Sequence, residues 1–160
     1  MGLDVVAYRS AVLTEPHPNT EACEDLEHVP AFHLGFEQSF RGLLWDRCYE
    51  CRGEDFYFSV RYSGHAEFRQ MLARAALNVD AKDIYADPGP FRDKPFFELI
   101  YFADTQGCIG PLAAADLAAD FAHGRDTGVR ARLDEADQSL YDDWSRAFTL
   151  AGGGGLVYFS

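Results

Sequence analysis

The chain has 160 residues, of which 48% are hydrophobic and 14% aromatic, and its formal net charge is −12. This length fits a single domain, 1–160, with enough apolar material for a core that needs no disulfide or metal. The acidic balance disfavours direct binding to duplex DNA, because phosphate contacts need clustered lysines and arginines. The acidity serves solubility first, although it could also attract a basic partner.

The start of the sequence predicts neither a secretory signal nor a membrane span. Met1-Gly2-Leu3-Asp4 lacks a basic region, and no apolar run approaches the length of a membrane helix. Four cysteines in such a chain indicate free thiols in a reducing compartment. We therefore expect a cytoplasmic protein without membrane contact.

The first third of the chain predicts strands separated by an acidic loop. Residues 2–12 are rich in strand-forming side chains and contain no proline. Segment 14–29 combines two prolines with several acidic residues and is expected to be an exposed loop. A short strand is expected within 30–36. Residues 56–62 alternate apolar and polar side chains, which predicts a half-buried strand.

The remaining two thirds predict three helices and a closing strand. Residues 66–77 carry Phe68, Leu72 and Ala76 at helical spacing. A loop is expected at 78–94, and 96–102 fits either a buried strand or a short helix, of which we favour the helix. A helix at 112–122 follows Pro111. The segment 124–136 is expected to be a mobile loop.

The last helix, 138–150, places Leu140, Trp144 and Phe148 on one apolar stripe, so Trp144 is expected in the core. A run of glycines ends this helix, and 156–159 is expected to pair with the first strand. Together these elements predict an α+β fold, in which a small antiparallel sheet containing both termini packs against about three helices.

The strongest candidate for a ligand contact is the polar turn 104–110, which follows an apolar block. Asp104 could accept hydrogen bonds from a ligand, and free amides at the start of the next helix could hold an anion. Pro111 has no N–H and weakens the anion-binding interpretation. The alternative is a turn in which Asp104 satisfies backbone amides and glycines supply positive φ.

A second candidate is the turn from Tyr62 and Ser63 into a helix that carries His65 and Arg69. These side chains offer stacking, hydrogen bonding and charge, which suits ligand contact. Ser63 and His65 also raise the alternative of a small hydrolase that uses His65 with Asp104 or Glu98. The turn lacks the Gly-x-Ser-x-Gly spacing of a nucleophile elbow, which argues against that alternative.

Two further pairs are weaker candidates. Cys48 and Cys51 form half of a zinc motif, but no second pair completes it, so reduced thiols are the better interpretation. Asp116 and Asp120 lie one helical turn apart and could bind a divalent ion or act as acid and base. A solvated acidic face explains this pair of carboxylates better. We therefore expect no metal and no cofactor.

The order of several short motifs resembles a family of small uncharacterised proteins of phages and prophages. The matching pieces are the start Met-Gly-Leu-Asp-Val-Val-Ala-Tyr, the turn Tyr62-Ser63-Gly64, the block 96–104 with Ile-Gly-Pro, the segment 116–121, and Trp144 with Phe148 before the glycines. The family pattern has an aromatic residue where this chain has His65. The resemblance implies an accessory protein in a bacterial cytoplasm, with no known activity. By analogy, such proteins often antagonise host defence.

The leading functional hypothesis is a non-enzymatic binding protein, a counter-defence factor that sequesters a small polar, nucleotide-like ligand. The alternatives are an acidic protein-interaction module or nucleic-acid mimic that inhibits a host protein, and the small hydrolase. A homo-oligomer is compatible with each of these. The expected ligand contacts are Tyr62, Ser63, His65, Arg69, Glu98, Asp104, Gln106, Gly107 and Gly110.

Overall fold

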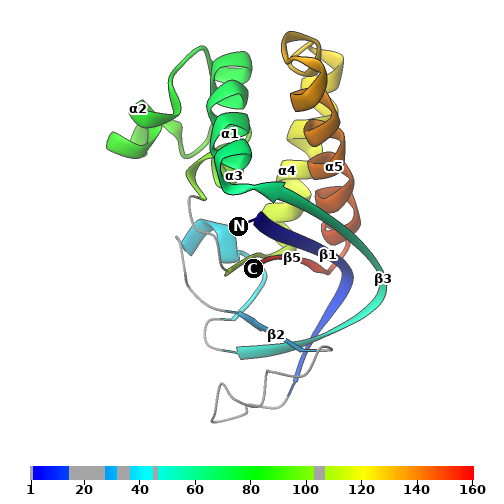
Figure 1. The fold of residues 1–160 in the computed structure, drawn as a ribbon. Helices are drawn as coiled ribbons and strands as arrows, with labels where there is room; N and C mark the ends of the chain where they lie inside the picture. Colours follow the sequence, from blue (N-terminus) through cyan, green and yellow to red (C-terminus); the bar gives the residue numbers. More distant parts are fainter. Residues whose placement is uncertain (1, 15–27, 32–36, 45–46, 103–106) are drawn as a thin grey trace.

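A five-stranded antiparallel sheet forms the base of the molecule (Figure 1). The computed structural model describes residues 2–14, 28–31, 37–44, 47–102 and 107–160. The strands lie in the order β2-β3-β1-β5-β4. Their bounds are β1 Gly2–Leu13, β2 His28–Ala31, β3 Arg47–Arg61, β4 Gly107–Ile109 and β5 Leu156–Phe159.

Both ends of the chain meet in the middle of this sheet (Figure 1). Val5 of β1 lies opposite Phe159 of β5. Beyond this pair, the backbones of Asp4 and Ser160 exchange hydrogen bonds of 2.9 and 3.0 Å. The predicted α+β fold and the predicted pairing of the two terminal strands are therefore confirmed.

The long pair formed by β1 and β3 contains a bulge. The register shifts between Tyr8 and Ser10, so that Arg9 faces the two residues Gly53 and Glu54. Gly53 has a φ of +83°, a conformation that costs glycine little. A bulge of this kind bends its strand and redirects the neighbouring side chains. In Figure 1, β3 curves around the right-hand side of the molecule.

Helices cover one face of the sheet (Figure 1). Asp134 begins the last of them by accepting a 2.8 Å hydrogen bond from the backbone N–H of Asp137, which caps the helix. Among the described residues, none of the helices combines the length and apolarity that crossing a bilayer requires. The helices are α1 Tyr62–Leu77, α2 Ala81–Ala86, α3 Phe97–Tyr101, α4 Pro111–Asp126 and α5 Glu135–Ala151.

An aromatic core lies between the helices and the sheet. Trp144 of α5 is fully buried and stacks on Phe148 and Phe159, with ring centres 5.5 and 5.6 Å apart. The ring of Phe58 on β3 meets Trp144 edge-on at 4.9 Å. Burial of such rings stabilises the packing of a helix on a sheet by a few kcal/mol each, about 1.5–3. The prediction that Trp144 belongs to the core is confirmed.

The structure differs from the sequence prediction in two connections. The predicted loop 78–94 contains α2, whose Ile84 is fully buried, and a 3₁₀ turn at Gly89–Phe91. The predicted mobile loop 124–136 contains the end of α4, a 3₁₀ turn and the start of α5. In this segment Val129 and Leu133 are only 6% and 4% exposed, so the connection is anchored in the core.

Other differences concern the strands. The predicted loop 14–29 lies largely outside the described residues, and its last two residues belong to β2. β2 therefore begins two residues before the segment 30–36 in which a strand was predicted. The predicted strand 56–62 is the end of the longer β3, and β4 was not predicted. A three-residue strand such as β4 is too short to show a period in the sequence.

Candidate functional site

Arg69 joins α1 to the segment just before the predicted turn 104–110. This side chain is 7% exposed, and its Nη1 donates to the carbonyl oxygens of Phe102, at 2.9 Å, and Ile100, at 3.3 Å. Its guanidinium also lies 5.8 Å from the ring centre of Tyr85. Arg69 therefore fastens α1 to the end of α3. It performs this role from the interior of the protein.

His65 is also an interior residue. It is 3% exposed and lies against Trp144, with ring centres 5.4 Å apart. Neither ring nitrogen has a hydrogen-bond partner among the described residues. Burial, reinforced by the positive charge of Arg69, lowers the pKa of His65 to about 3. His65 therefore packs as a core ring beside Trp144.

The other predicted residues fall in three places. Asp104 and Gln106 lie outside the described residues. Ser63 is exposed, and Tyr62 packs on the edge of the core. Gly107 begins β4 with a φ of +131°. The three described residues of this set thus lie at the edge of the core, on the surface and in the sheet.

Gly110 allows a close approach of two backbones. Its N–H donates to the carbonyl oxygen of Ser39 at 2.8 Å, and an added Cβ would lie 2.5 Å from the carbonyl oxygen of Arg41. The 3₁₀ turn Glu37–Phe40 and the residues after it thereby dock on the start of α4. Gly110 thus positions one wall of the cavity described next.

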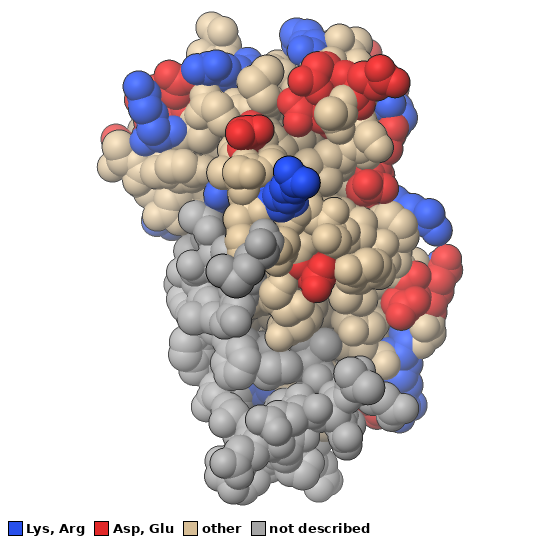
Figure 2. Space-filling view, in the orientation of Figure 1, with Lys and Arg blue, Asp and Glu red and all other residues tan. Residues whose placement is uncertain are grey.

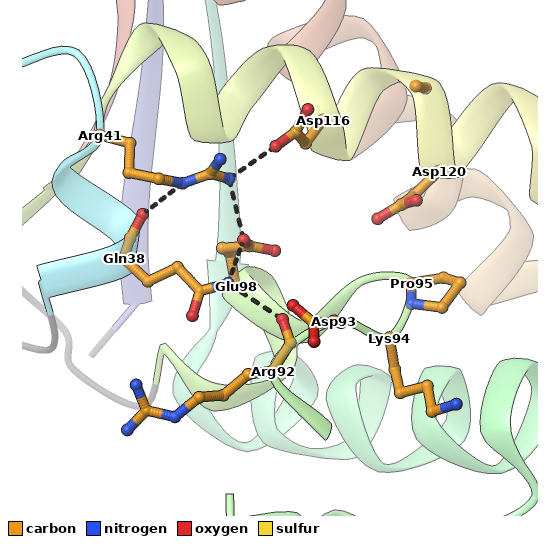
Figure 3. Close-up of a pocket in the computed structure, with 10 residues that line it drawn as sticks. Gln38, Arg41, Arg92, Asp93, Lys94, Pro95, Glu98, Asp116 and Asp120 are labelled. Atoms are coloured by element: carbon orange, nitrogen blue, oxygen red, sulfur yellow. Dashed lines mark hydrogen bonds and ion pairs between the residues drawn. The ribbon is translucent and has the colours of Figure 1, made fainter. Parts of the chain in front are cut away.

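Glu98 is the predicted contact that does line a cavity. A pocket of about 360 Å³ opens beside it, which is at the small end of ligand-binding sites (Figure 3). We name it the Glu98 pocket. Its lining residues are Gln38, Arg41, Arg92, Asp93, Lys94, Pro95, Glu98, Asp116, Ala119 and Asp120.

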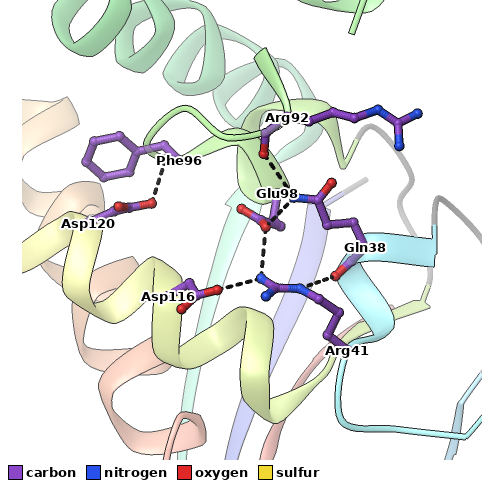
Figure 4. A network of polar contacts seen from close by, with 7 residues as sticks. All are labelled: Gln38, Arg41, Arg92, Phe96, Glu98, Asp116 and Asp120. Carbon is purple, nitrogen blue, oxygen red and sulfur yellow. Dashed lines mark hydrogen bonds and ion pairs between the residues drawn. The ribbon is translucent and has the colours of Figure 1, made fainter. Parts of the chain in front are cut away.

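A polar network holds the Glu98 carboxylate in place (Figure 4). Glu98 is 5% exposed and accepts from Nε2 of Gln38 at 2.8 Å and from Nη2 of Arg41 at 3.0 Å. Arg41 also pairs with Asp116 at 2.7 Å. Gln38 reaches the carbonyl oxygen of Arg92 at 3.0 Å. Because a buried carboxylate needs such partners, the network fixes the geometry of the inner wall.

Asp120 occupies the opposite wall and points from α4 into the pocket (Figure 3). Its Oδ2 accepts the backbone N–H of Phe96 at 2.7 Å. Burial raises the pKa of Asp120 to about 6; the Phe96 N–H opposes that effect, and the charges of Glu98 and Asp116 add to it. Asp120 therefore carries a carboxylate charge that its surroundings do not fully compensate.

The residue that donates to Asp120 has an unusual backbone. Phe96 has a φ of +63°, in the left-handed region that bulky residues rarely adopt. Its ring is buried edge-on against Phe121, with centres 5.0 Å apart. Such conformations cost about 1–3 kcal/mol and concentrate at functional sites. This strained residue thus holds Asp120, which lines the pocket, through its backbone N–H.

The charges of the pocket are sorted between its interior and its rim. Figure 3 shows the carboxylates of Asp93, Glu98, Asp116 and Asp120 around the pocket, where Arg41 pairs with Glu98 and Asp116. The side chains of Arg92 and Lys94 extend outward, away from the network. The interior therefore favours groups that donate hydrogen bonds or carry positive charge, and the rim offers cations to an anionic group.

The cysteines and acidic pairs do not assemble a metal centre in the described residues. No group of three His, Cys, Asp or Glu side chains there could hold a metal ion. Cys51 and Cys108 are free, and burial raises the pKa of each thiol to about 12. Cys48 is disulfide-bonded, so the expectation of free thiols throughout the chain is wrong for this residue.

The sequence pointed to only part of the Glu98 pocket. Asp116 and Asp120 were recognised as a pair but interpreted as a solvated face. Their position next to the buried Leu117 and Phe121 is the signal that could have placed them at the edge of the core. Gln38 and Arg41 carry no recognisable motif. Comparisons with protein-family models, with curated proteins and with solved structures each return no match.

Proposed function

We propose that this protein is a non-enzymatic binding protein that holds a small polar ligand in the Glu98 pocket. The observation that carries the proposal is Asp120, a carboxylate with a pKa raised to about 6 that faces a pocket lined by three further carboxylates, those of Asp93, Glu98 and Asp116. A ligand N–H or ammonium group would supply the compensation that this carboxylate lacks. The ligand therefore carries at least one such donor.

A nucleotide-like ligand agrees with the sorting of charges. A base with amino groups can donate to Asp120 in the interior, while a phosphate can reach Arg92 and Lys94 at the rim. The volume of about 360 Å³ suits a molecule of nucleoside or mononucleotide size. A small polyamine would bind the carboxylates of the interior and would not need Arg92 or Lys94. Binding of a nucleotide would depend on these two cations, which distinguishes the two classes of ligand.

The hydrolase alternative finds little support in the position of His65. A general base needs to lie within hydrogen-bond reach of the group that it serves. His65 is buried against Trp144, has a pKa lowered to about 3, and has no partner among the described residues. Glu98 in turn is occupied by Gln38 and Arg41. We therefore favour binding over catalysis.

The nucleic-acid-mimic alternative requires a continuous stripe of carboxylates. On the face drawn in Figure 2, the acidic side chains gather in separate groups, with lysines and arginines between them. This distribution favours the ligand-binding proposal. Within that proposal, the resemblance to phage and prophage proteins would make this protein an accessory factor of a bacterial cytoplasm, where sequestering a signal nucleotide would counter host defence.

A thermal-shift panel tests the proposal directly. We would compare nucleosides, nucleotides and polyamines at pH 7.5, because a ligand present at 100 times its Kd stabilises by about 2.7 kcal/mol. One class should raise the melting temperature of the wild type and of Asp126→Asn, which removes an exposed carboxylate from α4. The same compounds should leave Asp120→Asn unshifted. An equal shift in Asp120→Asn would exclude Asp120 as the contact.

A further inference from the structure

A second pocket lies where α5 packs on β1 and β3. Its volume is about 390 Å³. We name it the Arg146 pocket. Its lining residues are Arg9, Glu54, Arg125, Asp142, Ser145, Arg146, Thr149 and Leu150.

Arg146 is held in place by an aromatic ring rather than by a carboxylate. Its guanidinium carbon lies 4.2 Å from the ring centre of Phe56 on β3. This stacking fixes the side chain while leaving the N–H groups of the guanidinium for other partners. Among the described residues, no carboxylate forms an ion pair with Arg146. A positioned guanidinium with unused donors is the usual core of an oxyanion site.

The two carboxylates that line the pocket, Glu54 and Asp142, are already paired with arginines. Asp142 accepts from Arg130 through both oxygens, at 2.9 and 2.7 Å, and from Arg125 at 2.8 Å. The hydrogen bonds from Arg130 are the main reason that the pKa of Asp142 lies below its ordinary value. Glu54 pairs with Arg9. The carboxylates of the pocket therefore leave an excess of positive charge, in contrast to the interior of the Glu98 pocket.

The sheet is shaped to bring one of these arginines to the pocket. The bulge that sets Arg9 opposite Gly53 and Glu54 redirects side chains at the point where β1 passes under α5. Bulges are frequent beside binding sites because they aim a side chain out of the regular alternation. The hydroxyl of Ser145 adds a neutral donor to the same lining.

We propose that the Arg146 pocket is a second binding site, which takes a phosphate-type oxyanion of a small molecule. Arg146 is the principal contact, and Arg125 and Arg9 flank it with donors beyond those used in their ion pairs. In a chain with a net charge of −12, a local cationic pocket would concentrate an anion that the rest of the surface repels. This site is independent of the ligand proposed for the Glu98 pocket.

Backbone-amide NMR titration with inorganic phosphate, at constant ionic strength set with chloride, tests this proposal. Saturable shifts should map to Arg9, Glu54 and residues 145–150, with a Kd below about 10 mM. Arg146→Ala should weaken the binding by about tenfold or more, the value of a charge-assisted hydrogen bond. Arg61→Ala, which removes an exposed arginine elsewhere, should leave the Kd unchanged.

Three outcomes would overturn the proposal. These are shifts that stay linear to high phosphate, shifts that map only to residues 92–98 of the other pocket, and an unchanged Kd in Arg146→Ala. Because Arg146 is exposed, its replacement is not expected to unfold the protein, and the spectrum of the variant checks this point. Asp120→Asn should bind phosphate as the wild type does, which separates this proposal from the function proposed for the Glu98 pocket.

Discussion

The Oδ2 atom of Asp120 accepts the backbone N–H of Phe96 at 2.7 Å, across the gap between α4 and the start of α3. This contact joins a carboxylate with a raised pKa to a backbone with a φ of +63°. Proteins keep such costly features where they serve a purpose, and here they meet at Asp120, which lines the Glu98 pocket. The predictions below follow from this arrangement and from the residues that support it.

Asp120→Asn should stabilise the protein and weaken ligand binding. The folded-state pKa of about 6 lies above the ordinary value of 3.8, so the charged carboxylate opposes folding at neutral pH. Because solvent screens the partly exposed carboxylate, we expect the free energy of unfolding to rise by about 1 kcal/mol in this variant. Urea denaturation at pH 7.5 measures it. The control Asp126→Asn should change stability by less than about 0.5 kcal/mol.

Binding in the Glu98 pocket should depend on pH through the same group. Asp120 is ionised above a pH of about 6 and protonated below it, so a ligand donor loses its acceptor as the pH falls. Affinity should drop between pH 7 and 5 in the wild type, and it should drop equally in Asp126→Asn, which keeps Asp120. Isothermal titration of the ligand identified in the panel gives the profile. A flat profile in the wild type would contradict this role.

Arg41 and Glu98 should be energetically coupled. Removing Arg41 leaves the buried Glu98 with Gln38 as its remaining partner, and uncompensated buried charge is destabilising. Because Arg41 is partly exposed, we expect Arg41→Met to cost about 1–2 kcal/mol. Arg41→Met combined with Glu98→Gln should cost less than the sum of the single changes. Additive costs in this double-mutant cycle would show that the pair is not coupled.

Gly110→Ala should loosen the wall that carries Arg41. The added methyl group would lie 2.5 and 2.8 Å from the carbonyl oxygens of Arg41 and Phe40, so one backbone must move. We expect a loss of about 1–3 kcal/mol, the usual cost of overpacking. Gly153→Ala is the matched control, because its methyl group meets nothing within 4 Å. Equal stability of the two variants would refute the docking role of Gly110.

His65 should make the fold sensitive to acid. Its pKa is about 3 in the folded state and 6.5 in the unfolded chain. Between these two pH values, the unfolded chain therefore binds a proton at His65 that the folded protein does not bind. The contribution of His65 to the free energy of unfolding is therefore fully present above pH 6.5, and the free energy of unfolding falls by roughly 4–5 kcal/mol toward pH 3. His65→Phe should flatten this dependence in urea denaturation, whereas His123→Gln, at an exposed position, should leave it as in the wild type. An unchanged slope in His65→Phe would mean that the imidazole is not buried.

The sequence predicted the sheet and the long helices because their patterns are local. Alternation before Tyr62 and the stripe through Trp144 depend only on side-chain periodicity, and both appear in the structure. The sequence did not predict α2. It also did not predict that segment 124–136 is anchored in the core, because Val129 and Leu133 are isolated apolar residues whose burial depends on packing from distant segments.

The candidate site was less predictable than the fold for the same physical reason. Glu98 was identified, but its partners Gln38 and Arg41 lie about sixty residues earlier, in a segment without motif or period. The burial of side chains also differs from the sequence-based expectation for three residues. His65 and Arg69 resemble ligand contacts in the sequence and are interior residues in the fold, whereas Asp120 resembles solvated charge and faces a pocket.

The most direct test of the central claim is mass spectrometry of small molecules released from the purified protein. Wild type, Asp120→Asn and Asp126→Asn would be purified side by side from a bacterial host and denatured. We predict a polar compound with N–H donors in extracts of the wild type and Asp126→Asn, depleted about tenfold or more in Asp120→Asn. Equal amounts in all three extracts, or no compound enriched in the wild type, would contradict the proposed binding at Asp120.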